Sequence, residues 1–89
     1  MRAPRYTRQF EKDIKPIRKR GKDLAKLKPV ISTLIEGKPL AEQYRDHALL
    51  GNYKDRRECH LDPNWLLIYK LADDSIIFER AGTHSDLFE

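Results

Sequence analysis

The first third of the chain carries apolar residues at helical spacing. One stripe has members at positions i, i+4 and i+7: Phe10, Ile14 and Ile17. Thr7, just before this stripe, is suited to cap the helix with its hydroxyl oxygen. A second, wider stripe follows from about residue 22: Leu24, Leu27, Val30, Ile31, Leu34 and Ile35. Because Gly21 separates the stripes and Gly37 follows the second, as glycines do at helix ends, the pattern predicts two helices joined by a short turn.

The period of the pattern changes to two in the second half, which predicts strands. Residues 53–61 alternate, and one face of that strand should carry Lys54, Arg56, Glu58 and His60. Residues 65–71 are almost all apolar, as in a central strand covered on both faces, and residues 75–81 are a third candidate strand. Residues 2–6 should form a short edge strand, because Pro4 cannot donate to a ladder. We expect residues 38–51 to be a loop that has room for a single turn of helix, and residues 83–89 to be a short tail.

Helices followed by a run of strands are typical of the α+β class. We therefore predict two N-terminal helices packed on a small antiparallel sheet. The 89 residues suffice for one hydrophobic core and a single domain, residues 1–89. No apolar run approaches the roughly 18 residues that span a bilayer, the N-terminus lacks the apolar segment of a signal peptide, and Cys59 has no second cysteine to pair with. These features favour a cytoplasmic protein with no membrane partner.

The charge is divided unevenly along the chain. Residues 1–38 contain 12 Lys and Arg against 4 Asp and Glu, a net charge of +8, whereas residues 39–89 contain 6 against 10, a net charge of −4. A basic half attracts polyanions such as nucleic acid. A lysine-rich, solvated helix face would carry the same charge, so composition alone leaves both interpretations open.

Three histidines and an arginine in the C-terminal half are candidates for chemistry: His47, His60, His84 and Arg80. Cleaving RNA without a metal requires a base for the 2′-OH, an acid for the departing 5′-oxygen and a cation for the phosphoryl oxygens. Imidazole, with an ordinary pKa of about 6.5, serves as acid or base at neutral pH. Histidines at strand ends are also common surface residues, and spacing alone does not show that these three converge.

Neither a metal site nor a reactive cysteine is predicted. Cys59 and His60 are adjacent on a strand, so their side chains point to opposite faces and cannot share an ion. The spacings typical of metal sites, Cys-x-x-Cys and His-x3-His, do not occur. Cys59 shares its face with Leu61 and is expected in the core.

Four further residues are candidates for contact with a nucleic acid: Lys54, Arg56, Trp65 and Phe88. Aromatic side chains stack on bases, and cations on the face of His60 would meet a phosphate backbone. Each has a structural alternative. Trp65 opens the central strand and also suits a core. Phe88, near the end of the chain, should either pack against the body of the protein or contact a ligand. Lys54 and Arg56 also suit a solvated sheet face.

Several segments, in order, carry a resemblance to a known family: Phe10-Glu11-Lys12-Asp13, Asp46-His47-Ala48-Leu49, Arg57-Glu58-Cys59-His60, Pro63-Asn64-Trp65, Gly82-Thr83-His84 and Leu87-Phe88. Together they extend over most of the chain and resemble YafQ-type toxins of the RelE superfamily, from bacterial type II toxin–antitoxin systems. The resemblance implies a small α+β fold and cleavage of messenger RNA in the ribosomal A site, without a metal or other cofactor. It also implies a tightly bound antitoxin protein, with DNA contacted only through the antitoxin complex.

The resemblance assigns the active site to six positions: His47, His60, Trp65, Arg80, His84 and Phe88. It implies that His84 is the general acid and that Arg80 binds the scissile phosphate. The general base would be His60 or His47, an alternative that stays open. The two aromatic residues would position bases or shape the site.

One position departs from the family. Many relatives have an active-site aspartate after Pro63, where this chain has Asn64. An amide donates and accepts hydrogen bonds but cannot carry a proton near neutral pH. Either catalysis depends on the histidines, or activity is reduced. Asp62, two residues before Asn64, is a candidate to substitute for the missing carboxylate.

Three hypotheses follow for the function. The first is a ribosome-dependent endoribonuclease toxin, which predicts that cleavage is lost when His84 or Arg80 is replaced. The second is a non-catalytic RNA- or ribosome-binding module, which predicts salt-sensitive binding without a product. The third is a protein-binding partner whose basic helices are covered by an acidic chain, which predicts no affinity for RNA.

Overall fold

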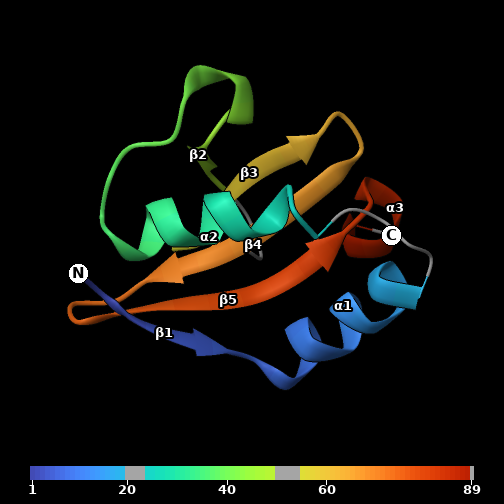
Figure 1. Cartoon of the computed structure of the whole chain (residues 1–89), viewed down its shortest axis with the longest axis horizontal. Coiled ribbons are helices and arrows are strands. Elements are labelled where there is room, and N and C mark those ends of the chain that lie inside the picture. The colour runs from blue at the N-terminus through green and yellow to red at the C-terminus, as the bar shows by residue number, and fades with distance from the viewer. Residues whose placement is uncertain (20–23, 50–54, 89) are drawn as a thin grey trace.

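One mixed five-stranded sheet organises the part of the chain that this computed structural model describes, residues 1–19, 24–49 and 55–88 (Figure 1). In chain order the elements are β1 (Ala3–Tyr6), α1 (Arg8–Lys19), α2 (Leu27–Ile35), the 3-10 helix η1 (Glu42–Tyr44), β2 (His47–Ala48), β3 (Arg57–Asp62), β4 (Trp65–Leu71), β5 (Ser75–Gly82) and α3 (His84–Phe88). The strand order is β1-β5-β4-β3-β2, with β1 parallel to β5 and the other neighbours antiparallel. The predicted α+β fold is confirmed, and a parallel edge strand is added to the antiparallel sheet.

The first helix forms where the sequence predicts it. The Phe10 N–H donates to Thr7 Oγ1 at 3.0 Å, so Thr7 caps α1. The apolar stripe of α1 is buried. The second helix, α2, begins at Leu27, several residues later than predicted. Because proline is tolerated in the first turn of a helix but disrupts the interior, Pro29 limits how far toward the N-terminus α2 can extend.

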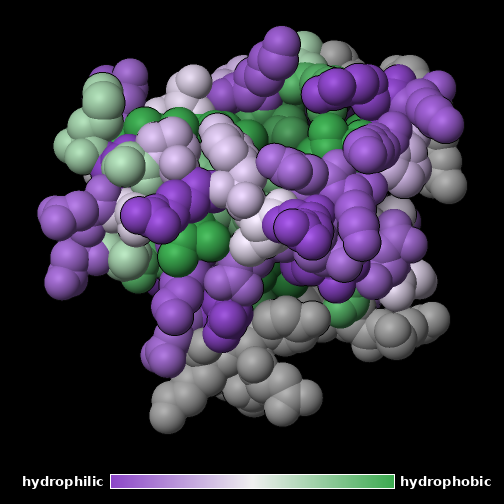
Figure 2. Space-filling model, turned by 90° about the horizontal axis from the view of Figure 1, so that it is seen from below, coloured by the Kyte–Doolittle hydropathy of each residue, from purple (hydrophilic) through white to green (hydrophobic). Residues whose placement is uncertain are grey.

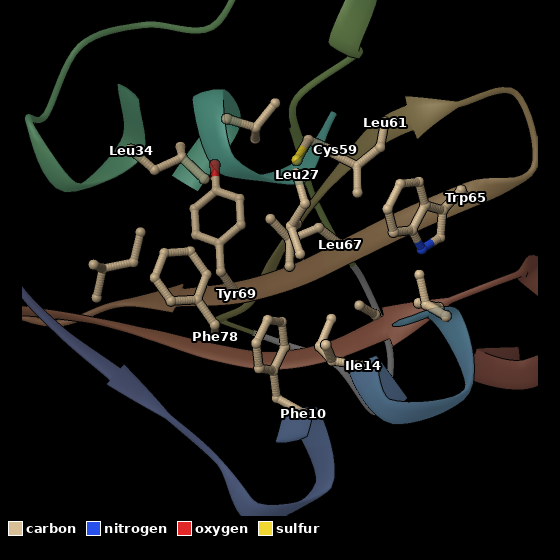
Figure 3. Packing of buried hydrophobic residues seen from close by; sticks show 14 residues of the cluster. Phe10, Ile14, Leu27, Leu34, Cys59, Leu61, Trp65, Leu67, Tyr69 and Phe78 are labelled. Atoms are coloured by element: carbon tan, nitrogen blue, oxygen red, sulfur yellow. The ribbon is translucent and has the colours of Figure 1, made fainter. Parts of the chain in front are cut away.

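Two apolar clusters lie on opposite faces of the sheet. The larger cluster joins α1 and α2 to the strands, and Figure 3 shows Phe10 and Ile14 of α1 near Phe78 of β5. Cys59 belongs to this cluster, as predicted. The smaller cluster consists of Leu66, Ile68 and Leu87, with Leu49 packed against it. Because successive residues of β4 alternate between the two clusters, this strand is covered on both faces, which confirms its central position.

Two short elements differ from the prediction. Strand β2 lies within the segment expected to be a loop and pairs with β3, and helix α3 occupies most of the expected tail. Two residues cannot display a period of two, and five cannot display a helical stripe, so neither element has a periodic signature. The strand expected from residue 53 is observed from Arg57, and residues 50–54 lie outside the described part. No helix in the described ranges is long and apolar enough to cross a membrane.

Candidate active site

A row of paired residues crosses four strands of the sheet. His47 of β2 pairs with Glu58 of β3, which in turn pairs with Ile68 of β4. Ile68 also pairs with Arg80 of β5. Directly paired residues of antiparallel strands point to the same face, so this row lies on the face of the smaller apolar cluster.

The adjacent row on the same face leads to the third histidine. His60 of β3 pairs with Leu66 of β4, and Leu66 pairs with Gly82 at the end of β5. Adjacent strands lie about 4.8 Å apart, so the Cα atoms of His60 and Gly82 are separated by about 10 Å. His84 begins α3 two residues after Gly82, and Leu87 anchors this helix on the smaller apolar cluster. The third histidine therefore begins a helix that packs on the face carrying the other two.

An extra residue in β5 decides which face Arg80 occupies. Tyr69 pairs with Phe78, but the preceding residue, Ile68, pairs with Arg80, so Glu79 forms a β-bulge. Residues two apart in a regular strand share a face, and Phe78 is buried in the larger cluster. Without the bulge, Arg80 would point toward that cluster.

His47, Glu58 and His60 form a polar cluster on this face. The Oε1 atom of Glu58 lies 3.1 Å from His60 Nε2 and 3.7 Å from His47 Nε2. Glu58 is only 5% exposed. A buried carboxylate is stable only with compensating partners, and the two imidazoles provide them. The structure thus brings together two of the three predicted histidines, around a carboxylate that the sequence analysis did not single out.

A backbone carbonyl orients the ring of His47. Its Nδ1 lies 2.6 Å from the carbonyl oxygen of Arg45. Because a carbonyl oxygen only accepts hydrogen bonds, Nδ1 carries a proton, and in the neutral ring the lone pair is on Nε2. That lone pair belongs to the nitrogen nearest Glu58. Arg45 itself has a left-handed conformation (φ 47°), which turns the chain from η1 into β2.

Arg80 is held by Asp13 of α1. The guanidinium donates from Nε to Asp13 Oδ2 at 2.9 Å and from Nη2 to Oδ1 at 3.3 Å. The Ala81 N–H donates to the same Oδ2 atom at 3.0 Å, so one carboxylate fixes both the side chain and the adjacent backbone. Asp13 lies in the first segment of the family resemblance, but no role was assigned to it there.

The Gly-Thr-His segment has a local structural explanation. The Asp86 N–H donates to Thr83 Oγ1 at 3.2 Å, and the Thr83 N–H donates to Asp86 Oδ2 at 3.1 Å. This reciprocal pair is a capping box that starts α3 at His84. A Cβ atom on Gly82 would lie 3.2 Å from the Cβ of Asp86, so the close approach of α3 to β5 favours glycine there.

The four predicted RNA-contact residues have different environments in the structure. Trp65 is 3% exposed and lies in the larger apolar cluster, which favours its alternative interpretation as a core residue. Arg56 donates from Nε to Glu79 Oε1 at 2.8 Å, across β4. Phe88 ends α3, and the role of its side chain stays a prediction. Lys54 lies outside the described residues.

Three further groups near the candidate site have contacts or burial that limit their chemistry. Burial raises the pKa of the Cys59 thiol from 9.0 to about 12, and the charges of Asp46 and Glu58 add to this shift. Burial also raises the pKa of Tyr69, whose hydroxyl donates to Asp46. Asp62, the candidate substitute for the missing aspartate, accepts a hydrogen bond from Lys26 Nζ at 2.7 Å.

Glu58 is the principal residue that the sequence analysis missed. Its position on the same predicted strand face as His60 indicated that it lies near the histidine. However, a glutamate on a face that also carries lysine and arginine is usually expected to be exposed to solvent. Its burial depends on the pairing with β2, which had no signature of its own. Chemically, the cluster offers imidazole nitrogens for proton transfer beside a carboxylate that stabilises an imidazolium.

Comparisons with known proteins agree with this architecture. Residues 2–89 match the family described as bacterial toxin of type II toxin–antitoxin system, YafQ. The mRNA interferase toxin YafQ of Escherichia coli strain K12 is 48% identical over 84 residues, which cover 93% of this chain and 91% of that toxin.

Solved structures give the same result. A chain in the crystal structure of the E. coli DinJ–YafQ toxin–antitoxin complex has a TM-score of 0.92 and 46% identity, covering 99% of this chain and 98% of that one. A copper-bound mutant toxin from Helicobacter pylori has a TM-score of 0.95 and 41% identity, covering 99% of this chain and all of that one. Fold and sequence together define a small bacterial toxin of the type II toxin–antitoxin class. Within that class, the chain belongs to the YafQ family.

Proposed function

We propose that this protein is an mRNA interferase that acts in the cytoplasm, cutting messenger RNA in the ribosomal A site without a metal ion. The observation that carries the proposal is the cluster of His47, Glu58 and His60 on the sheet face that also bears Arg80. The relative from E. coli is named an mRNA interferase toxin, and its likeness to this chain extends over nearly the whole of both. The cluster supplies proton-transfer groups and the arginine supplies a cation.

Cleavage would begin with removal of the 2′-OH proton. The 2′-oxygen then attacks the adjacent phosphorus while the bond to the 5′-oxygen breaks, leaving a 2′,3′-cyclic phosphate and a 5′-hydroxyl. The sequence left His60 and His47 as alternative bases, and the geometry favours His47. Its side chain is 50% exposed and the proton on Nδ1 leaves Nε2 available, whereas that of His60 is 22% exposed and its Nε2 lies beside Glu58. Glu58 would stabilise the imidazolium that proton uptake creates.

The remaining roles follow from the placement of α3 and Arg80. His84, exposed at the first position of α3, would donate the proton to the departing 5′-oxygen. Arg80 would bind the non-bridging phosphoryl oxygens, on which charge increases in the transition state. We propose Phe88, Lys54 and Arg56 as contacts to the RNA. Trp65 would shape the site from within the core rather than stack on a base.

A cleavage assay with ribosomes programmed by a defined mRNA tests this function. We expect cuts at the A-site codon, and no cuts in the same mRNA without ribosomes. His84→Gln and Arg80→Ala should each lower the rate at least about 10²-fold, while Ser85→Ala, also on α3, should leave it unchanged. Cleavage should persist with a chelator that removes transition metals but leaves the Mg²⁺ that ribosomes need. Binding to ribosomes without any product would instead favour the non-catalytic alternative.

The proposed partner is an antitoxin with an acidic segment. The outer side of α1 forms an open groove of about 580 Å³ lined by Lys12, Lys15, Pro16, Arg18 and Lys19. Aliphatic stems of lysine and arginine provide apolar walls, and their charged ends surround them. Figure 2 shows the side of the molecule on which α1 lies, where hydrophilic residues enclose smaller apolar areas. An acidic, amphipathic segment that folds on contact matches this surface.

A further inference from the structure

A recess of about 350 Å³, within the size range of small-ligand sites, lies beside His60 at the end of β3. Its wall includes residues of the segment before β2 and of the end of β3: Gln43, Tyr44, Arg45, His60, Asp62 and Pro63. We propose that this recess binds a base of the messenger RNA next to the bond that is cut, and that it favours bases with an exocyclic amino group. This inference rests on the proposed function, because it names the part of the substrate that the same site recognises.

The recess forms where the pairing of β2 with β3 stops. His47 pairs with Glu58, and continuing that register by two residues would place Arg45 opposite His60. Arg45 instead has a left-handed conformation (φ 47°), which takes the chain out of the ladder and into η1 (Figure 1). Among the described residues, the end of β3 from His60 to Asp62 therefore pairs on one side only, with β4. Residues other than glycine rarely adopt this conformation, and such strain is concentrated at functional sites.

The recess lies on the far side of the candidate catalytic residues from Arg80. The strand order places β5, which carries Arg80, two strands from β3, and η1 contacts β3 on its other side. If Arg80 binds the scissile phosphate and the attacking 2′-OH lies beside a histidine of β2 or β3, the nucleotide that carries this hydroxyl is nearest to the recess. The recess should therefore bind the base of that nucleotide.

The wall of the recess suits a planar ring. Tyr44 is partly buried and packs against the larger apolar cluster, which limits the movement of its ring. The exposed side chain of Arg45 lines the same recess. Aromatic rings and guanidinium planes are the groups on which proteins stack single-stranded bases. Because the Arg45 carbonyl also orients the ring of His47, one residue joins the recess to the candidate general base.

The polar groups of the recess favour particular bases. Lys26 Nζ donates to Asp62 Oδ1 at 2.7 Å, which orients this carboxylate, and a carboxylate accepts several hydrogen bonds. Adenine, cytosine and guanine have an amino group that can donate to it, whereas uracil has none. Gln43 both donates and accepts, so it adds affinity for any base. Asp62 thus takes a role in recognition, instead of the proton transfer that the sequence left open.

Nucleotide binding tests the recess without any cleavage. We expect 2′-deoxyadenosine 3′,5′-bisphosphate, which lacks the attacking hydroxyl, to shift the backbone amide resonances of Gln43, Arg45 and Asp62 in the full-length protein. The deoxyuridine bisphosphate should bind at least about fivefold more weakly, and Asp62→Asn should bring the two affinities close together. Glu42→Gln, an exposed change on the same 3-10 helix, should keep the wild-type ratio. No shift at these amides, or equal affinity of the wild-type protein for the two nucleotides, would overturn the base site.

Cleavage tests whether the recess selects the substrate. Four mRNAs on programmed ribosomes would differ only in the base of the nucleotide whose 2′-OH attacks. We expect kcat/KM with A, C or G to exceed that with U at least about fivefold, and Asp62→Asn to narrow this difference, which a loss of stability alone would not do. Arg45→Asn keeps a residue that tolerates a positive φ but removes the guanidinium, so kcat/KM should fall at least about fivefold for all four mRNAs. Equal kcat/KM of the wild-type protein for the four mRNAs would overturn the selective role.

The two experiments separate this inference from the proposed function. If the recess prefers the deoxyadenosine nucleotide but the protein cuts no mRNA, the proposed function fails and the base site stands. If the protein cuts all four mRNAs alike and the recess amides do not respond to either nucleotide, the base site fails and the proposed function stands.

Discussion

The Asp13 carboxylate on the first helix binds the guanidinium of Arg80 through two hydrogen bonds, of 2.9 and 3.3 Å, and joins the two ends of the chain at the candidate site. Asp13 is well shielded, with 10% of its side chain exposed, and it also accepts the N–H of Ala81. A shielded, two-point ion pair limits the orientations of an arginine more than a solvated contact does. The first helix therefore positions a group that the proposed chemistry needs on β5.

Replacing this carboxylate should reduce activity without altering the charge of Arg80. Asp13→Asn keeps the size of the side chain but loses the ion pair, so we expect kcat/KM for mRNA cleavage to fall about 10- to 100-fold through misplacement of Arg80. The free energy of unfolding should fall by about 1–2 kcal/mol. Both are measured by the ribosome assay and by denaturant titration. Glu11→Gln, an exposed change on the same helix, should affect neither quantity. Unchanged kcat/KM in Asp13→Asn would show that the pair is structural alone.

The capping box of α3 should matter for activity more than for global stability. Thr83→Ala removes the hydroxyl that accepts the Asp86 N–H, a contact worth about 1 kcal/mol in other helices. Because α3 is short and terminal, we expect it to fray, and cleavage to fall severalfold as His84 loses its position. Hydrogen exchange of the α3 amides and the cleavage rate check this expectation. Ser85→Ala is the matched control. Equal cleavage rates for Thr83→Ala and Ser85→Ala would contradict the expected role of the capping box.

The buried thiol should make the fold sensitive to high pH. The folded protein keeps Cys59 protonated up to a pKa of about 12, whereas the unfolded chain releases that proton above pH 9.0. Between these values the unfolded state binds fewer protons, so stability falls as pH rises. From pH 8 to pH 10 the thiol contributes a loss of about 1 kcal/mol.

Denaturant unfolding of wild type and Cys59→Ala at both pH values measures this contribution. The variant should show the smaller loss, since lysine titration affects both proteins alike. The raised pKa of Tyr69 acts in the same direction at still higher pH. Parallel pH dependences for the two proteins would rule out the thiol as a cause.

Charge reversal on α1 should weaken the antitoxin complex. Lys15→Glu combined with Lys19→Glu changes two groups that line the open groove on the outer side of α1. We expect affinity for the cognate antitoxin to fall tenfold or more at low salt, with a smaller dependence on salt concentration, because opposite charges steer such association. Lys28→Glu with Lys38→Glu makes the same change in net charge away from α1 and should have little effect. Equal losses for both pairs would assign the effect to net charge instead of the groove.

The sequence predicts those elements whose apolar pattern is long enough to repeat. Helix α1 and strands β4 and β5 have this property, and their predicted limits agree closely with the structure. Strand β2 and helix α3 are too short to repeat, and they carry His47 and His84. Two of the candidate catalytic residues, His47 and His84, thus lie where periodicity is least informative, whereas His60 and Arg80 lie on longer strands.

The candidate site is predictable in its residue types but not in its assembly. Histidine and arginine chemistry, with the family resemblance, indicates His47, His60, Arg80 and His84. The polar environment of Glu58 depends on a strand pairing with no local signal, and the role of Asp13 depends on a contact across 67 positions of the chain. Such contacts are properties of the folded topology, so the residues alone could not reveal them.

The bulge at Glu79 makes the orientation of Arg80 depend on the number of residues in β5. Deleting the Glu79 codon would leave every other amino acid in place, yet the register rule would turn the Arg80 side chain from the face of the smaller apolar cluster toward the larger one. Since burying a guanidinium in an apolar cluster is costly, the deletion should destabilise the fold. The length of β5, and not only its composition, is therefore under constraint, and a gene in this family should tolerate substitutions between Phe78 and Arg80 far better than a change in their number.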